Sequence, residues 1–125
     1  SFGDIITIIC YEILFSDEIN KRISKETNLI INITNDAWFG KTVGPYQHLA
    51  LAQIKAVELG LPIVRVANTG ISAFISPFGE KLVEIDLNQE DAKTIEIISK
   101  LKSTYYRKFG DSIFLFLLFF LVLWD

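Results

Sequence analysis

Apolar and polar segments alternate along the chain in a way that predicts a mixed α/β fold. Residues 5–10 form a continuous run rich in β-branched residues, which is typical of a strand buried on both faces, and residues 29–34 are predicted to form a second strand. Between them, Ser16 is predicted to cap a helix that reaches to about residue 26, with Ile19 and Ile23 on its apolar side. Two strands joined by a helix of this length normally pair in parallel, through a right-handed crossover.

The second half of the chain continues with one more helix and a set of short strands. A loop over 35–44 leads to a helix that Pro45 starts and Gly60 ends. Further strands are predicted at residues 63–67, 71–76, 81–86 and 94–99, with a tight turn at 77–80 between the second and the third. This element order predicts a mixed α/β sheet with two helices on one face. The other face then needs a cover that this chain does not contain.

The end of the sequence is an unbroken apolar run from Ile113 to Trp124. As a helix the run would be about 18 Å long, whereas the core of a bilayer is about 30 Å thick. Because the run contains no polar residue that could form a solvent-facing side of the helix, residues 112–125 are predicted to form a short or truncated transmembrane helix. A buried core helix is the alternative. Residues 1–103 are then the folded domain, and residues 104–111 are a juxtamembrane linker.

Composition narrows the chemistry that the chain can carry. Its 12 basic and 15 acidic residues form no basic stripe, so the sequence predicts no nucleic-acid partner. A single Cys excludes an internal disulfide framework, and one His with one Cys matches no known ligand set, so we predict no metal and no cofactor. The single cysteine is therefore either a small buried residue or a nucleophile.

Cys10 stands where a predicted strand ends and a helix is about to begin. At this position α/β enzymes expose a nucleophile, and nearby backbone N–H groups stabilise an oxyanion. A thiolate suits two-step acyl transfer, because a second nucleophile can open the thioester. If the backbone stays extended, Glu12 projects to the same side as Cys10 and orients a substrate or holds a proton; the alternative is a helix-start carboxylate. His48, in the middle of a predicted helix, is more typical of a structural residue.

The loop from Asn35 to Gly40 carries a Trp-Phe pair directly after a buried strand. Two aromatic side chains are costly to leave in water, so Trp38 and Phe39 either plug the core or line an apolar pocket. The loop follows the carboxyl end of a parallel-type strand, where α/β proteins bind their ligands. This placement favours the pocket, and it makes Asn35, Trp38 and Phe39 candidate substrate-binding residues.

Six segments in order resemble the nitrilase superfamily, and in detail the apolipoprotein N-acyltransferase family. They are Ile9-Cys10-Tyr11-Glu12, residues 32–40, Gly44-Pro45-Tyr46-Gln47-His48, Lys55-Ala56-Val57-Glu58, residues 65–72 and Pro77-Phe78-Gly79. The resemblance covers the chain from about residue 5 to the tail. It implies part of a nitrilase-like α-β-β-α sandwich, followed by a C-terminal transmembrane helix.

The resemblance also implies a reaction and a location. Cys10 matches the nucleophile of a Glu-Lys-Cys triad, which takes an acyl chain from a phospholipid and passes it to the N-terminal amine of a diacylglyceryl apolipoprotein. Tyr11 and Glu12 match residues beside the nucleophile, with Tyr11 a candidate for substrate binding, and Trp38 matches an aromatic residue of the active-site loop. The family's acyltransferases lie in the bacterial inner membrane, and their catalytic domain faces the periplasm.

The catalytic Glu and Lys of the family precede its nucleophile, whereas only nine residues precede Cys10. The chain also contains no Met, and its start lacks the basic region of a signal peptide. We therefore expect a piece of a longer enzyme, inactive alone, whose missing N-terminal half carries the Glu and the Lys. A soluble nitrilase-type carbon-nitrogen hydrolase and a non-catalytic remnant are the alternatives.

Charges near the tail conflict with the implied location. Four basic residues precede the apolar run, and by the positive-inside rule they favour a cytoplasmic domain; they are Lys100, Lys102, Arg107 and Lys108. Large translocated domains override this rule, and basic side chains also bind lipid headgroups. We therefore expect the periplasmic side.

Overall fold

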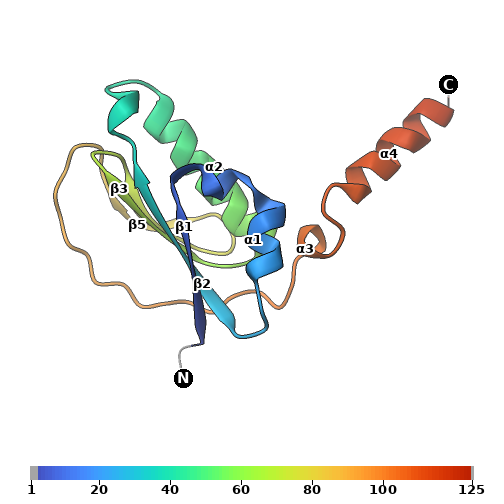
Figure 1. Cartoon of the computed structure of the whole chain (residues 1–125), viewed down its shortest axis with the longest axis horizontal. Coiled ribbons are helices and arrows are strands. Elements are labelled where there is room, and N and C mark those ends of the chain that lie inside the picture. Colours follow the sequence, from blue (N-terminus) through green and yellow to red (C-terminus); the bar gives the residue numbers. More distant parts are fainter. Residues whose placement is uncertain (1–2, 125) are drawn as a thin grey trace.

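A five-stranded sheet forms the centre of the computed structural model, which describes residues 3–124 (Figure 1). In chain order the elements are β1 (Asp4–Ile9), η1 (Cys10–Leu14), α1 (Ser16–Arg22), β2 (Thr27–Asn35), η2 (Ala37–Phe39), α2 (Gly44–Leu59), β3 (Ile63–Asn68), β4 (Ser72–Ile75), β5 (Lys81–Ile85), α3 (Tyr105–Phe109) and α4 (Ser112–Leu123). The strand order in the sheet is β1-β2-β3-β4-β5. The first three strands are parallel and the last two pair antiparallel, which confirms the predicted mixed sheet.

The parallel register brings the carboxyl ends of three strands to one edge of the sheet. Ile9 at the end of β1 pairs with Ile33, and Asn35 at the end of β2 pairs with Asn68 at the end of β3. The segments that follow these strands therefore start at the same edge. Cys10 is the first residue after β1, and the 36–40 loop follows β2.

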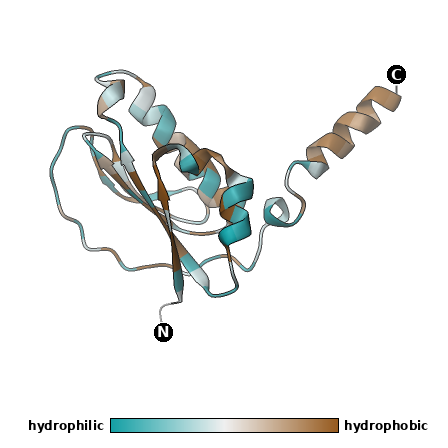
Figure 2. Cartoon of the chain, viewed as in Figure 1, coloured by the Kyte–Doolittle hydropathy of each residue, from teal (hydrophilic) through white to brown (hydrophobic). Residues whose placement is uncertain are grey.

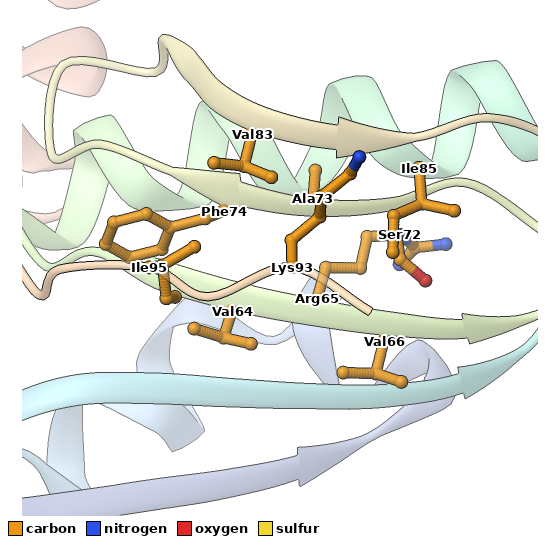
Figure 3. A pocket seen from close by; sticks show the side chains of 10 residues that line it. All are labelled: Val64, Arg65, Val66, Ser72, Ala73, Phe74, Val83, Ile85, Lys93 and Ile95. Carbon is orange, nitrogen blue, oxygen red and sulfur yellow. The ribbon is translucent and has the colours of Figure 1, made fainter. Parts of the chain in front are cut away.

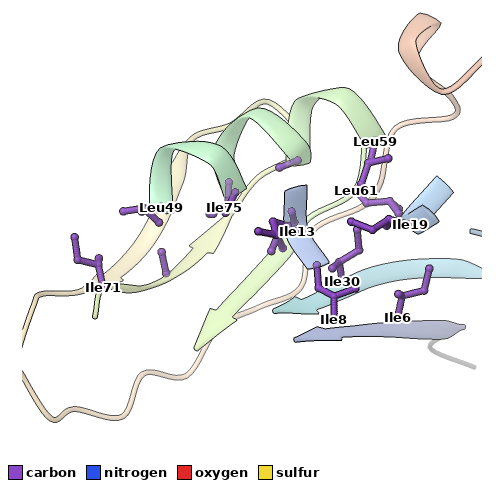
Figure 4. Close-up of a cluster of buried hydrophobic side chains, with 14 residues drawn as sticks. Ile6, Ile8, Ile13, Ile19, Ile30, Leu49, Leu59, Leu61, Ile71 and Ile75 are labelled. Carbon is purple, nitrogen blue, oxygen red and sulfur yellow. The ribbon is translucent and has the colours of Figure 1, made fainter. Parts of the chain in front are cut away.

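One face of the sheet carries the hydrophobic core, under the helix α2 (Figure 4). Ile8, Ile30 and Ile63 point from the three parallel strands into this core and are fully buried. Ala52 and Ala56 of α2 are also fully buried, because their short side chains let the helix lie close to the sheet. Burying a side chain of the size of Ile stabilises the fold by about 1.5–3 kcal/mol.

The opposite face of the sheet is not covered by the described residues at its parallel end. Ile5, Ile9, Ile33 and Val66 are 47 to 64 % exposed, and they alternate with buried neighbours along their strands. The prediction that the strand at 5–10 is buried on both faces is therefore wrong within this chain. The expectation that one face lacks its cover agrees with this exposure.

The first helix differs from its prediction at both ends. Phe15, not Ser16, is the N-cap residue, and Ser16 is the first helical residue. The Ser16 hydroxyl donates a hydrogen bond to Glu58 Oε2 at 2.7 Å, so it ties α1 to α2 instead of capping a helix. The helix ends at Arg22, because Ile23 has an extended backbone.

The strand predicted at 94–99 does not form. This segment is extended but pairs with no strand in the described structure, and Ile95 lies beside Val64 and Phe74 over the sheet (Figure 3). Ile95 therefore meets the surface of the sheet and not its edge. Sequence periodicity alone does not distinguish the two.

The apolar tail forms α4, which stands apart from the domain and is hydrophobic all round (Figure 2). All of its residues are exposed, so the alternative of a buried core helix is wrong. Within residues 3–124, no helix is both long and apolar enough to cross a membrane. The transmembrane helix at 112–125 stays a prediction, and Asp125 lies outside the described residues.

The predicted linker at 104–111 contains the short helix α3, which is held against the domain. The Thr104 hydroxyl donates to the Glu58 carbonyl oxygen at the end of α2. Asn20 Nδ2 donates to the Arg107 carbonyl oxygen at 3.0 Å, and Arg107 Nε donates to Asn20 Oδ1 at 3.3 Å. Arg107 is thereby fixed to α1.

Candidate active site

Cys10 stands in a strained turn at the end of β1. Its φ is +49°, a left-handed conformation that costs a residue with a side chain about 1–2 kcal/mol. The thiol is free and partly buried. Strained residues of this kind cluster at functional sites, where the surrounding structure holds them in place. The structure thus puts the candidate nucleophile at the strand end, as the sequence predicts.

Glu12 does not project alongside Cys10, because the backbone turns into η1 at residue 10 instead of staying extended. Its side chain folds back, and Ile9 N–H donates to Glu12 Oε2 at 2.5 Å. This is the half of a capping box in which a carboxylate holds the backbone before the helix. The geometry therefore corresponds to the helix-start alternative, with the carboxylate acting on the backbone beside the candidate nucleophile.

A buried ion pair lies at the same edge of the sheet. Arg65 Nη2 donates to Asp36 Oδ2 at 2.6 Å, and both side chains are fully buried. Arg65 Nη1 donates to Asn32 Oδ1 at 2.9 Å, and Arg65 Nε donates to the Ile71 carbonyl oxygen at 3.3 Å. Burial lowers the pKa of Arg65, while Asp36 and a thiolate at Cys10 oppose that shift. The pair and Asn32 thus form a buried polar cluster, and Asn32 Nδ2 in turn donates to the Cys10 carbonyl oxygen at 3.4 Å.

Sequence reasoning did not single out this pair. The available signal was Arg65 within the β-branched run from 63 to 67, since a charged residue in a buried strand needs a charged partner. Its partner could not be chosen from the sequence, because Asp36 lies 29 residues away.

His48 extends this cluster from the first turns of α2, and not from the middle of the helix as predicted. Its Nδ1 lies 3.0 Å from Asp36 Oδ1, and its side chain is 2 % exposed. Burial and the charge of Arg65 lower the pKa of His48 and outweigh Asp36 and the Cys10 backbone, which raise it. Nδ1 of the neutral imidazole then donates to the carboxylate. Nε2 is buried and has no hydrogen-bond partner among the described residues.

Aromatic side chains connect His48 to the residue beside Cys10. The Tyr11 ring stacks on the His48 ring with a centroid distance of 5.1 Å and an angle of 20°. Phe39 contacts both rings edge-on, with centroid distances of 6.4 Å to Tyr11 and 6.0 Å to His48. The structure therefore brings together Tyr11 and Phe39, two of the predicted substrate-binding residues.

The other two predicted binding residues lie differently. Trp38 is 75 % exposed, so the alternative that it plugs the core is wrong. Asn35 Oδ1 accepts hydrogen bonds from Ala37 N–H at 3.1 Å and from Asn68 Nδ2 at 3.3 Å. Asn35 thus shapes the loop that carries Trp38 and ties β2 to β3.

A small apolar cavity of about 130 Å³ opens elsewhere, over the antiparallel part of the sheet (Figure 3). Its walls come from β3, β4, β5 and the 93–95 segment, and they include Val64, Phe74 and Val83. None of the predicted site residues lines it. Within residues 3–124, no three His, Cys, Asp or Glu side chains gather closely enough to hold a metal ion.

The fold and this arrangement define a nitrilase-like α/β protein with a cysteine in a tight turn after a parallel strand. The chain belongs to the carbon-nitrogen hydrolase family, whose family model matches residues 1–106. This match confirms the resemblance predicted from the six motifs.

Curated relatives narrow the resemblance further. An apolipoprotein N-acyltransferase of Rickettsia bellii is 48 % identical over 118 residues, which are 93 % of this chain and 23 % of the relative. One from Rhizobium leguminosarum is 55 % identical over 82 residues, which are 66 % of this chain and 15 % of the relative. The chain therefore spans about a quarter or less of the curated relatives that it matches.

Solved structures agree with the fold. A carbon-nitrogen hydrolase of Helicobacter pylori matches with a TM-score of 0.57 at 15 % identity, covering 69 % of this chain and 37 % of that one. An amidase of a Nesterenkonia species matches with a TM-score of 0.54 at 20 % identity, covering 68 % and 34 %. In that amidase structure the active-site cysteine carries a covalent acetamide group.

Proposed function

We propose that this chain is the nucleophile-bearing part of an apolipoprotein N-acyltransferase, and that Cys10 carries the acyl group. The observation on which this rests is the strained turn at Cys10, at the edge of the sheet where three parallel strands end. The similarity of 93 % of this chain to the Rickettsia bellii acyltransferase supports the proposal. The amidase whose active-site cysteine forms an adduct supports the choice of a cysteine nucleophile.

The proposed reaction has two steps. The Cys10 thiolate attacks an ester carbonyl of a phospholipid; a C–S bond forms, the ester C–O bond breaks, and the lysophospholipid leaves as an alcohol after taking up a proton. The N-terminal amine of a diacylglyceryl apolipoprotein then attacks the thioester. A C–N bond forms, the C–S bond breaks, and the amine proton is transferred to restore the thiol.

The side chains around Cys10 are assigned separate roles in this proposal. Glu12 holds the backbone before the nucleophile, as its bond to Ile9 N–H suggests. Trp38 offers an exposed aromatic surface to an acyl chain, and Tyr11 and Phe39, which contact each other beside Cys10, offer further apolar surface. Asn35 sets the shape of the 36–40 loop, which carries Trp38 and Phe39.

Two parts of the proposed enzyme come from outside this chain. The resemblance requires a Glu base and a Lys, and the carboxylate nearest in sequence to Cys10, Glu12, is already bonded to the Ile9 backbone. The uncovered face with Ile5, Ile33 and Val66 offers a place for the other half of the sandwich. We place the domain at the bacterial inner membrane on the periplasmic side, and we expect the chain alone to be inactive.

A second candidate is a soluble amide hydrolase that uses the same cysteine. It is favoured by the structural likeness to an amidase. The two candidates differ in the second nucleophile, which is an amine in the first and water in the second. A non-catalytic remnant would form no thioester with either substrate.

The test combines the full chain with a separately produced upstream half from the Rickettsia bellii relative. The complex is incubated with phospholipid vesicles, and mass spectrometry measures a palmitoyl adduct on the single cysteine of this chain. We expect an adduct that Cys10→Ala abolishes and that the chain alone does not form. A folded complex without any adduct, or one that instead releases ammonia from short amides, would overturn the acyltransferase proposal.

A further inference from the structure

We propose that the buried Arg65–Asp36 pair is a positioning device for Cys10, which acts through Asn32 and His48. The inference rests on the proposed function in one respect, namely that Cys10 is the nucleophile. It assigns a role to four residues that take no part in the chemistry themselves. Three sets of contacts carry it, one on each side of Cys10 and one on its own carbonyl group.

The first set holds the carbonyl group of Cys10. Asn32 Nδ2 donates to the Cys10 carbonyl oxygen at 3.4 Å. The amide of Asn32 has one donor end and one acceptor end, and Arg65 Nη1 donates to the acceptor end at 2.9 Å. Because a guanidinium has no acceptor, this bond fixes which way the amide points. Arg65 thereby presents the amino group of Asn32 to the Cys10 backbone.

The second set holds the residue after Cys10. Asp36 Oδ1 accepts from His48 Nδ1 at 3.0 Å and from the Thr34 hydroxyl at 3.3 Å. These bonds fix the plane of the imidazole, on which the Tyr11 ring stacks. The same carboxylate binds Arg65 through Oδ2, so one buried residue connects both sets.

The third contact holds the residue before Cys10, where Ile9 N–H donates to the Glu12 carboxylate. Ile9, the Cys10 carbonyl and the Tyr11 ring are thus each bonded or stacked. Cys10 itself, between the held residues Ile9 and Tyr11, has a positive φ. A residue with a side chain rarely keeps a positive φ unless its surroundings restrain it. The geometry points to a network that maintains this turn and with it the direction of the thiol.

The chain offers a matched pair of substitutions to test this role. Asn32→Asp keeps the acceptor for Arg65 but removes the donor to Cys10. Asn20, on α1, has the same kind of bonds but none to Cys10: it donates to the Arg107 carbonyl and accepts from Arg107 Nε. Asn20→Asp is therefore the control with the same amide-to-carboxylate change, at a half-buried site. Arg65→Lys keeps the charge near Cys10 but loses the planar fork that binds Asn32 and Asp36 together.

The first readout is the rate at which iodoacetamide alkylates the single thiol of the 125-residue chain. We expect Asn32→Asp and Arg65→Lys to change the native rate about tenfold, with the rate in urea unchanged, and Asn20→Asp to leave both unchanged. The ¹⁵N shifts of His48, the only histidine, should still report a proton on Nδ1 in Asn32→Asp. Circular dichroism checks the fold, and if Arg65→Lys unfolds, Asn32→Asp alone decides. Native rates equal to wild type in folded Asn32→Asp would overturn the inference.

The second readout separates this inference from the proposed function. In the reconstituted complex, Asn32→Asp should lower the rate constant of thioester formation and leave the apparent KM for phospholipid unchanged. A wild-type adduct with no effect of Asn32→Asp overturns the positioning role and leaves the acyltransferase standing. A missing wild-type adduct, with altered alkylation in Asn32→Asp, overturns the acyltransferase and leaves the positioning role standing.

Discussion

The guanidinium of Arg65 lies 2.6 Å from the carboxylate of Asp36, and neither side chain reaches solvent. Arg65 belongs to β3, whereas Asp36 follows the neighbouring strand β2. The pair therefore forms only when these strands are in register. It connects the sheet to the turn that presents Cys10, because its partners Asn32 and His48 contact that turn.

Asp36→Ala should destabilise the domain strongly. Removing one partner of a buried ion pair leaves an uncompensated charge and costs about 3–5 kcal/mol. Urea unfolding, followed by circular dichroism, measures the loss. Asp91→Ala, which breaks the exposed pair with Lys93, is the control and should change the free energy of unfolding by less than about 1 kcal/mol. Equal losses in the two variants would contradict the structure.

Gly70→Ala should disturb the site without any change of charge. A Cβ at Gly70 would lie 2.4 Å from Asp36 Oδ2 and 2.7 Å from Asp36 Cβ, so the carboxylate has to move. Overpacking of this kind costs about 1–3 kcal/mol, and we expect the alkylation rate of Cys10 to change as well. Gly110→Ala meets nothing within 4 Å and tests backbone strain alone. An unaltered alkylation rate in Gly70→Ala would argue against the close approach.

The free energy of unfolding should depend on the protonation of His48. Its pKa in the folded chain lies below the ordinary 6.5, so on acidification the unfolded chain takes up this proton first. The stability that comes from keeping His48 neutral is therefore fully present above about pH 6.5, and it is lost as the pH falls through the pKa of His48 in the folded chain. Urea titrations at several pH values measure the slope. His48→Gln, which cannot titrate, should lack the His48 part of it; an identical slope in both proteins would contradict the assignment.

Trp38→Ala should leave stability nearly unchanged and lower acyl transfer. The side chain is 75 % exposed, so its removal leaves no cavity. If it binds an acyl chain, loss of about 1.5–3 kcal/mol of apolar contact corresponds to at least a tenfold lower rate. The reconstituted complex provides the rate, and thermal unfolding provides the stability. Val43→Ala, at another exposed apolar residue near the loop, is the control and should keep the wild-type rate.

The tail should bind the chain to lipid vesicles. After Ser112, all of α4 is apolar and exposed, and an Asp in the middle of such a helix opposes insertion by about 2.5–3.5 kcal/mol. Vesicle flotation should therefore recover the wild-type chain and lose Leu117→Asp. Leu82→Asp, on the exposed surface of β5, adds the same charge outside the tail and should float like wild type. Wild-type protein that stays in the aqueous fraction would favour the soluble hydrolase.

Local sequence signals were enough to predict most of the elements and the position of the proposed nucleophile. The apolar runs located β1 and β2, and Pro45 and Gly60 marked the ends of α2, whose last residue precedes a left-handed glycine. These signals are local, since they depend on the conformations and the burial that each short segment favours. Cys10 was located in the same way, because it directly follows an apolar run.

The surroundings of Cys10 depend on tertiary contacts that no single segment predicts. Asn32, Asp36, His48 and Arg65 come from three elements and a loop, and strand register and helix packing bring them together. The direction of Glu12 goes with the turn into η1 at Cys10, and 94–99 pairs with no strand of the described residues, while its Ile95 lies over the sheet surface. Contacts between distant segments are set by packing, which the pattern of a single segment does not encode. Local signals therefore predict where the proposed nucleophile lies, and packing between distant segments sets how it is held.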